Sequence, residues 1–208
     1  MLGSFCLSWY PQGMQKRHII TICGMLGSGK STAAKRVAVA LNYPHYSAGD
    51  FMRAMATERG ITLGELNILA EGDATVDREI DAKQKLFMDT HDDFVIDSRI
   101  GWFLAPDSFK VFLNLDLDTS AKRVFGDMVA KKAEREGEIA EMPETFEDVK
   151  VRLAERLASE KDRYKKYYAI EDYQDVSHFD LVIDTQANGI EAVEKLIIEG
   201  YNAWKAEA

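Results

Sequence analysis

Cysteine is scarce in this sequence, and what little there is excludes two classes of protein. The two residues present, Cys6 and Cys23, cannot form the disulfide framework of a small secreted domain. Their spacing does not match a metal site, and the four histidines show no pairing that suggests zinc binding or acid/base chemistry. We therefore expect a protein of the reducing cytoplasm.

Long apolar runs and a surplus of basic residues are also missing. No apolar run approaches the ~20 residues that a membrane-spanning helix needs. The formal net charge is −9 and the sequence pI is about 5.0, so no broad excess of lysine and arginine is available to neutralise a nucleic-acid backbone. We expect neither a membrane nor a nucleic acid as partner, and any cationic site must be local.

The length of 208 residues, 46% of them apolar, suits one α/β domain with a small appendage. We expect residues 1–17 to form an N-terminal tail and residues 18–208 a single domain. The tail has no basic segment before its apolar stretch, which makes it a poor signal peptide. Met14 is an alternative start, which would make residues 1–13 non-native. We expect a monomer, because no long surplus apolar face is visible.

One motif dominates what is present. The phosphate-loop pattern G-x-x-x-x-G-K-[ST] is matched by Gly24-Met25-Leu26-Gly27-Ser28-Gly29-Lys30-Ser31-Thr32. An apolar, β-branched run precedes it and a helical pattern follows, which is the context that the motif requires. A glycine-rich turn before an ordinary helix is the alternative, but chance rarely produces the pattern and both flanks together. The sequence therefore predicts a nucleotide-phosphate site.

Each part of this loop has an expected task. The glycines permit positive φ and a close approach of backbone N–H groups to an anion. Lys30 reaches the β and γ phosphates, and Thr32 can hold the α-phosphate. Ser31 begins a helix, whose N-terminus favours negative charge, and its hydroxyl can ligate Mg²⁺. These assignments predict ATP as the ligand, with Mg²⁺ as the cofactor.

The rest of the chain alternates between strand and helix patterns, which indicates a doubly wound parallel sheet. Strands are expected at residues 18–23, 45–47, 94–97, 110–115 and 179–184. Helices are expected at residues 30–41, 50–59, 63–70, 74–89, 120–136, from 143 to 168, and 189–206. Asp50 is expected to cap the second helix, Asp73 to open the fourth, and Pro143 to start the penultimate one.

Several cations could hold substrate phosphates. Four of them share one stripe of the helix that ends near residue 168, beside an apolar stripe: Arg152, Arg156, Arg163 and Lys166. The alternative is an exposed basic face, paired with Glu155, Glu160 and Asp162. The phosphate loop favours the functional interpretation, because phosphoryl transfer needs positive charge around the equatorial oxygens.

Three more residues follow expected strands. Arg53 comes after the second strand, and Asp97 and Arg99 come at the end of the third. Ligands of open α/β sheets bind at this carboxyl edge, so we expect Asp97 to hold Mg²⁺ through water. Alternatively, Asp97 is a solvated acid at the end of its strand, and Arg53 and Arg99 form surface ion pairs.

Together these motifs resemble a nucleoside monophosphate kinase of the cytidylate kinase family, nearer its compact archaeal-type members. The resemblance covers residues 18–200. Besides the phosphate loop, it rests on Tyr46-Ser47-Ala48-Gly49-Asp50-Phe51-Met52-Arg53, on Val95-Ile96-Asp97-Ser98-Arg99, on Arg156 with Asp162-Arg163-Tyr164, and on residues 179–185. Bacterial members usually read Asp-Gly-Arg-Asp where this chain has Asp97-Ser98-Arg99-Ile100.

The resemblance implies a P-loop kinase fold, a three-layer α/β/α arrangement on a five-stranded parallel sheet. It also implies a short helical acceptor-binding arm at about residues 50–92 and a lid at about residues 126–152. The acceptor-binding residues it implies are Ser47, Asp50, Arg53, Arg99, Asp162 and Arg163. The catalytic residues it implies are Lys30, Arg123, Arg156 and Arg163, with Arg123 and Arg156 on the phosphates in transit.

The implied reaction moves the γ-phosphoryl group of Mg-ATP to a pyrimidine nucleoside monophosphate, CMP or dCMP, giving the diphosphate and ADP. Two alternatives stay open. One is another small P-loop kinase, acting on a different nucleotide or on dephospho-coenzyme A. The other is an ATP-binding regulator without catalysis, which would have no need of so many additional arginines. In each case the expected partners are small-molecule nucleotides or metabolites.

Overall fold

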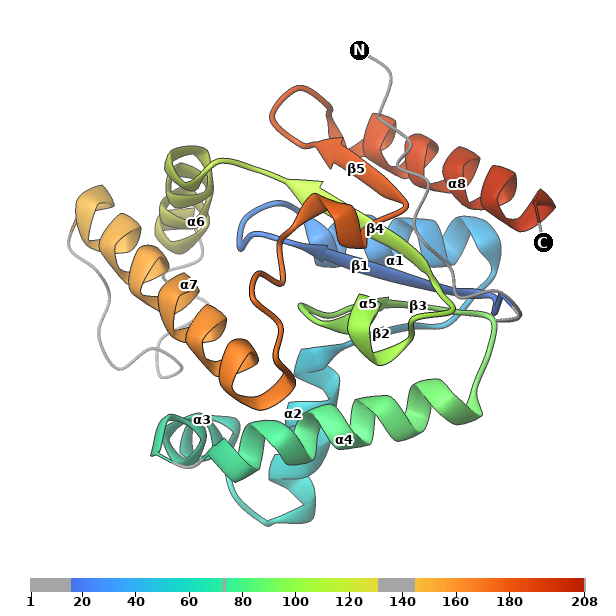
Figure 1. Ribbon diagram of the computed structural model, residues 1–208. Coiled ribbons are helices and arrows are strands. Elements are labelled where there is room, and N and C mark those ends of the chain that lie inside the picture. Colours follow the sequence, from blue (N-terminus) through green and yellow to red (C-terminus); the bar gives the residue numbers. More distant parts are fainter. Residues whose placement is uncertain (1–15, 73, 131–144, 208) are drawn as a thin grey trace.

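The computed structural model describes residues 16–72, 74–130 and 145–207. The expected tail up to residue 15, the alternative start at Met14, Asp73 and Pro143 lie outside these residues. A single sheet contains five parallel strands in the order β2-β3-β1-β4-β5 (Figure 1). The strands are β1 (Ile19–Gly24), β2 (His45–Ser47), β3 (Phe94–Asp97), β4 (Phe109–Asn114) and β5 (Leu181–Asp184).

Helices connect the strands and cover both faces of the sheet. They are α1 (Lys30–Leu41), α2 (Ala48–Glu58), α3 (Leu63–Gly72), α4 (Ala74–Thr90), α5 (Gly101–Leu104), α6 (Leu117–Ala130), α7 (Phe146–Tyr168) and α8 (Ile190–Ala206), with a 3₁₀ turn at Val176–His178. Within the described residues, none of these helices has the length and apolar character needed to cross a membrane. The layers confirm the predicted α/β/α class with its five-stranded parallel sheet.

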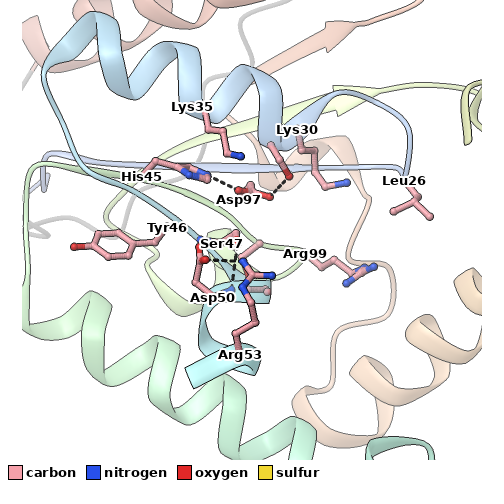
Figure 2. Close-up of a pocket in the computed structure, with 14 residues that line it drawn as sticks. Leu26, Lys30, Lys35, His45, Tyr46, Ser47, Asp50, Arg53, Asp97 and Arg99 are labelled. Atoms are coloured by element: carbon pink, nitrogen blue, oxygen red, sulfur yellow. Dashed lines mark hydrogen bonds and ion pairs between the residues drawn. The ribbon is translucent and has the colours of Figure 1, made fainter. Parts of the chain in front are cut away.

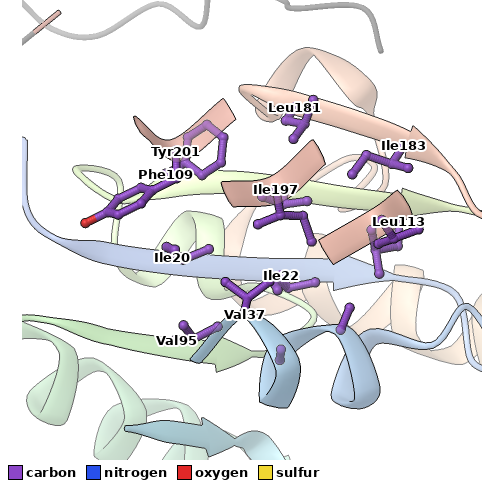
Figure 3. Close-up of a cluster of buried hydrophobic side chains, with 14 of the residues drawn as sticks. Ile20, Ile22, Val37, Val95, Phe109, Leu113, Leu181, Ile183, Ile197 and Tyr201 are labelled. Carbon is purple, nitrogen blue, oxygen red and sulfur yellow. The ribbon is translucent and has the colours of Figure 1, made fainter. Parts of the chain in front are cut away.

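One face of the sheet packs on α1 and α8. Side chains from four strands meet the two helices there in an aliphatic and aromatic cluster (Figure 3). Ile20 and Ile22 of β1, Val37 of α1, and Ile197 and Tyr201 of α8 are almost completely buried in it. β1 is buried along its whole length, which explains its continuously apolar sequence.

The opposite face carries a more aromatic cluster. Phe94, Phe112 and Phe179 belong to it with Tyr164 of α7 and Met88 of α4. The helices α2, α3 and α4 extend from the sheet and share a small core of their own, which contains Met55, Leu66, Val76 and Ile80. These three helices lie together at the bottom of Figure 1. We call them the helical arm.

The structure shifts several predicted boundaries. Asp50 does not begin α2: Ser47 is the N-cap, and Asp50 stands at the third helical position, where its carboxylate accepts the Ser47 backbone N–H in a capping box. A second capping box joins Thr145 to Asp148 and starts α7 at Phe146. α6 begins at Leu117, earlier than predicted, and is described as far as Ala130. The one-turn helix α5 was not predicted, since its four residues are too few for a periodic pattern.

Candidate active site

The phosphate loop joins the carboxyl end of β1 to the first turn of α1. Three of its glycines have positive φ, 150° at Gly24, 77° at Gly27 and 84° at Gly29. A Cβ added at Gly24 would lie 2.4 Å from the carbonyl oxygen of Leu113, so a side chain cannot be accommodated there. The conformation predicted from the glycine spacing is therefore present, and a close approach of the backbone enforces it.

Lys30 lies folded over this loop. Its Nζ donates hydrogen bonds to the carbonyl oxygens of Gly24, at 2.8 Å, and Met25, at 2.7 Å. Burial, reinforced by the charge of Arg99, lowers the pKa of Lys30 to about 8. The amino group therefore remains mostly protonated at neutral pH and is available to an anion on the loop.

Asp97 links the loop to a histidine. Its Oδ2 accepts a hydrogen bond from the Ser31 hydroxyl at 2.7 Å, and its Oδ1 lies 2.6 Å from His45 Nε2 (Figure 2). The hydroxyl and the carboxylate are hard oxygen donors side by side, the kind of ligand that Mg²⁺ takes in small number alongside water and phosphate. This donor set fits the predicted Mg²⁺ role of both residues.

A cavity of about 720 Å³ opens on this side of the loop. Its lining includes Lys30, Asp97 and Arg99 together with the start of the helical arm. Arg53 donates to Asp50 at 2.6 Å, and Ser47 contacts the other oxygen of Asp50 (Figure 2). Burial raises the pKa of Asp50, but the bonds from Ser47 and Arg53 outweigh it and leave that pKa below its ordinary value. We call this space the arm cavity.

A second cavity, of about 460 Å³, shares the phosphate loop as a wall. Its lining combines loop residues with α6 and the turn after β5: Gly27, Ser28, Gly29, Thr32, Lys122, Arg123, Gly126, Asp127, Thr185, Asn188, Gly189, Ile190 and Val193. Arg123 donates to the carbonyl oxygens of Thr185, at 2.7 Å, and Gly27, at 3.3 Å. We call this space the α6 cavity. Arg156 and Arg163, the other two predicted catalytic arginines, do not line it.

Arg99 and Arg156 meet at one carboxylate. The Nε atoms of both guanidinium groups lie 2.8 Å from oxygens of Glu160, which is 5% exposed. Tyr173 donates to the same carboxylate at 2.9 Å. A narrow cavity beside this group is bordered by the first residues of the phosphate loop. Part of the basic stripe of α7, Arg156, therefore lies at the site beside the phosphate loop, and the stripe is not wholly a surface feature.

Arg163 takes a different direction from the same helix. It pairs with Asp77 of α4, while Tyr168 donates to Asp81 of α4 at 2.9 Å. Burial and the neighbouring charge of Asp77 raise the pKa of Asp81 to about 6. Arg163 borders a small cavity with Arg99, next to the arm cavity. Asp162 is exposed on α7 and lines neither of the two large cavities.

The structure thus brings most of the predicted residues to the phosphate loop, but in separate groups. Ser47, Asp50, Arg53, Asp97 and Arg99 line the arm cavity; Arg123 stands in the α6 cavity. The sequence did not predict the contact of His45 with Asp97, or that Glu160 pairs with both Arg99 and Arg156. A signal for His45 did exist, because it precedes Ser47 by two positions on a strand that ends beside Asp97.

Comparison with solved structures places the fold. A structure of an uncharacterized protein from Eubacterium ventriosum has a TM-score of 0.60 at 22% identity and covers 88% of this chain and 98% of its own. Shikimate kinase from Acinetobacter baumannii has a TM-score of 0.57 at 13% identity, covering 89% of this chain and 93% of its own. Together with the phosphate loop, this likeness shows that the molecule has the fold of a P-loop kinase.

Sequence comparison gives the family. The model of the cytidylate kinase-like family matches residues 19–187. Cytidylate kinase of Haloarcula marismortui is 39% identical over 189 residues, 88% of this chain and 91% of that protein. Cytidylate kinase of Halobacterium salinarum is 34% identical over 191 residues, 91% of this chain and 92% of that protein. The chain belongs to the cytidylate kinase-like family, and it is a nucleoside monophosphate kinase, as the motifs predicted.

Proposed function

We propose that this enzyme transfers the γ-phosphoryl group of Mg-ATP to CMP or dCMP, and releases the diphosphate and ADP. The observation that carries the proposal is the pair of cavities that share the phosphate loop. Transfer between two nucleotides needs two adjoining sites with the transferred group between them. The choice of a cytidine nucleotide is supported by the cytidylate kinases that resemble this chain over most of its length.

ATP is assigned to the α6 cavity and the loop. Thr32 and the loop N–H groups would hold the α and β phosphates, and Lys30 would turn from the backbone carbonyls to the β and γ phosphates. Arg123 borders the space left for the adenosine, where its guanidinium is fixed by Thr185. This assignment gives Arg123 a role in binding ATP, in place of its predicted contact with the phosphoryl group in transit.

CMP is assigned to the arm cavity. Its phosphate would lie between Arg53 and Arg99, facing Lys30 across the loop. Its base would point toward the cavity that Arg163 and Asp81 border between α4 and α7. Asp162 is exposed and does not line these cavities, so its predicted ribose contact has no support from them.

Ser31 and, through water, Asp97 would hold Mg²⁺. The ion neutralises charge on the β and γ phosphates when it is bound. His45 would keep the Asp97 carboxylate turned toward Ser31, because it occupies the other carboxylate oxygen. No covalent intermediate is needed: the chain positions the two nucleotides, surrounds the transferred group with cations and limits the access of water. We also propose a cytoplasmic location, which agrees with the free, buried thiol of Cys23.

The test is ADP release from Mg-ATP in the presence of CMP, dCMP, UMP, AMP, GMP or dephospho-coenzyme A. Strong stimulation by CMP or dCMP is expected. Stimulation by another member of the panel alone would keep the kinase and overturn the choice of acceptor. Release that no acceptor increases would contradict the proposal as a whole.

A further inference from the structure

Glu160 is a buried carboxylate of α7, a helix whose other acidic residues are all exposed. Removing a carboxylate from water costs several kcal/mol unless charged partners compensate it. Burial favours the neutral acid, but the charge of Arg99 and the hydrogen bond from Arg156 outweigh burial and lower the pKa of Glu160. Glu160 is therefore an anion at every pH near neutrality.

Its partners come from three separate parts of the chain. Arg99 follows β3, Arg156 lies one helical turn before Glu160, and Tyr173 belongs to the segment that returns from α7 toward β5 (Figure 1). Two guanidinium groups at one point repel each other, and Arg156 is half exposed, so it could turn into solvent without cost from burial. The carboxylate is what keeps both cations in one place.

The manner of contact leaves these cations usable. Both arginines approach Glu160 through Nε, and among the described residues their terminal nitrogens make no hydrogen bond to any other group. Each guanidinium therefore retains its outer N–H groups for a phosphate. The cavity beside them is bordered by Gly24, Met25 and Leu26, so those groups lie at the phosphate loop.

We propose that Glu160 is a positioning residue, which with Tyr173 fixes Arg99 and Arg156 beside the phosphate loop for phosphoryl transfer. This inference rests on the proposed function. Glu160 does not touch the substrates; it sets where two of the cations around the transferred group stand. Its single negative charge offsets only part of the charge of Lys30, Arg99 and Arg156, so the region stays positive for the incoming phosphates.

The first test is kinetic. Replacing Glu160 by glutamine removes the charge and turns an N–H₂ group toward one arginine, so kcat should fall about 10- to 100-fold. The KM for ATP should stay within about threefold, because ATP is held by the loop and not by these arginines. Glu160→Asp keeps the charge and should recover part of the lost kcat. Glu155→Gln removes an exposed charge from the same helix and should behave as the wild type.

The second test does not depend on catalysis. In a ¹H–¹⁵N spectrum of the unliganded protein, the Arg99 and Arg156 Nε–H signals should exchange slowly with water in the wild type and in Glu155→Gln, and rapidly in Glu160→Gln. If the wild type transfers phosphoryl to CMP and Glu160→Gln has the same kcat, the positioning role is wrong. If the wild type transfers nothing to CMP, the proposed function fails, whatever the spectra show.

Discussion

At the scale of single residues, some side chains of the site stabilise the fold and others are available to bind a ligand. Lys30 belongs to the second kind. It donates hydrogen bonds to two backbone carbonyls of its own loop, and burial lowers its pKa, which favours the neutral amine. Phosphates in the loop would relieve both conditions by offering the ammonium group stronger acceptors.

Lys30→Ala should therefore abolish measurable phosphoryl transfer while the protein still folds. Two hydrogen bonds from a charged group are lost, but the cost of burying that charge, which lowers the pKa of Lys30, is removed with them. Because the two effects oppose each other, the free energy of unfolding should change by only about 2 kcal/mol. Denaturant unfolding and the ADP assay measure the two quantities. Lys195→Ala removes an exposed lysine of α8 as the control and should leave both unchanged. Turnover retained by the Lys30 variant would show that the site is elsewhere.

Arg53 should affect the acceptor and not ATP. It lines the arm cavity, and among the described residues its guanidinium pairs with Asp50, one turn earlier on α2. Arg53→Ala should raise the KM for CMP by about tenfold or more, through loss of a charged contact to its phosphate, with little change in the KM for ATP. Arg59→Ala, at the other end of α2, is the matched control. An unchanged KM for CMP would remove Arg53 from the acceptor site.

Most residues of the site could be named from the sequence because they lie within short motifs at strand ends. The loop glycines, Lys30, Ser31 and Asp97 follow from such local patterns. His45 and Glu160 could not be assigned in the same way, since their roles depend on partners that are distant in the chain, Asp97 for His45 and Arg99 for Glu160. A sequence pattern shows where a carboxylate is, but not which cations the fold brings to it.

At the scale of elements, the turn between β1 and α1 depends on the neighbouring strand as much as on its own sequence. Gly24 lies so close to β4 that an added Cβ would meet the Leu113 carbonyl oxygen, and its φ is also unfavourable for other residues. The strands and most helices were predicted because their patterns repeat. The cap of α2 was predicted at Asp50 instead of Ser47 because a capping box is defined by two side chains, of which either can be taken for the cap. The start of α7 was predicted at Pro143, and the helix begins at Phe146, after its cap Thr145.

Gly24→Ala should consequently destabilise the protein by about 2 kcal/mol or more and lower its affinity for ATP. Gly64→Ala provides the comparison, because Gly64 lies within α3 where a Cβ has room. That substitution should leave the midpoint of thermal unfolding unchanged or slightly higher. Equal unfolding midpoints for the two variants would contradict the account of the loop.

At the scale of the whole molecule, α7 connects the helical arm to the sheet. Arg163 and Tyr168 of α7 contact Asp77 and Asp81 of α4, while Tyr164 of the same helix is buried against the sheet. The arm cavity lies next to this connection. The position of the arm, and with it the acceptor site, is therefore tied to the same helix that carries Arg156 and Glu160.

This connection should be visible in the pH dependence of stability. Burial raises the pKa of Asp81 to about 6 in the folded protein, above the ordinary aspartate value of 3.8, so the folded state binds more protons than the unfolded state between these pH values. Its contribution to stability is therefore largest at low pH and is lost as the pH rises through about 6. Asp81→Asn cannot titrate, so its melting temperature relative to the wild type should be higher at pH 7 than at pH 4.

Asp89→Asn, on an exposed part of α4, serves as the control for removing a carboxylate from the same helix. A difference for Asp81→Asn that does not change with pH would mean that Asp81 is not perturbed in the folded protein.

The measurement that tests the central claim most directly is the fate of the γ-phosphoryl group itself. The enzyme is incubated with CMP and ATP labelled with ³²P at the γ position, and the products are separated. We expect the label to appear in CDP in step with the formation of ADP. Label found only in inorganic phosphate, or retained in ATP with every acceptor, would contradict it.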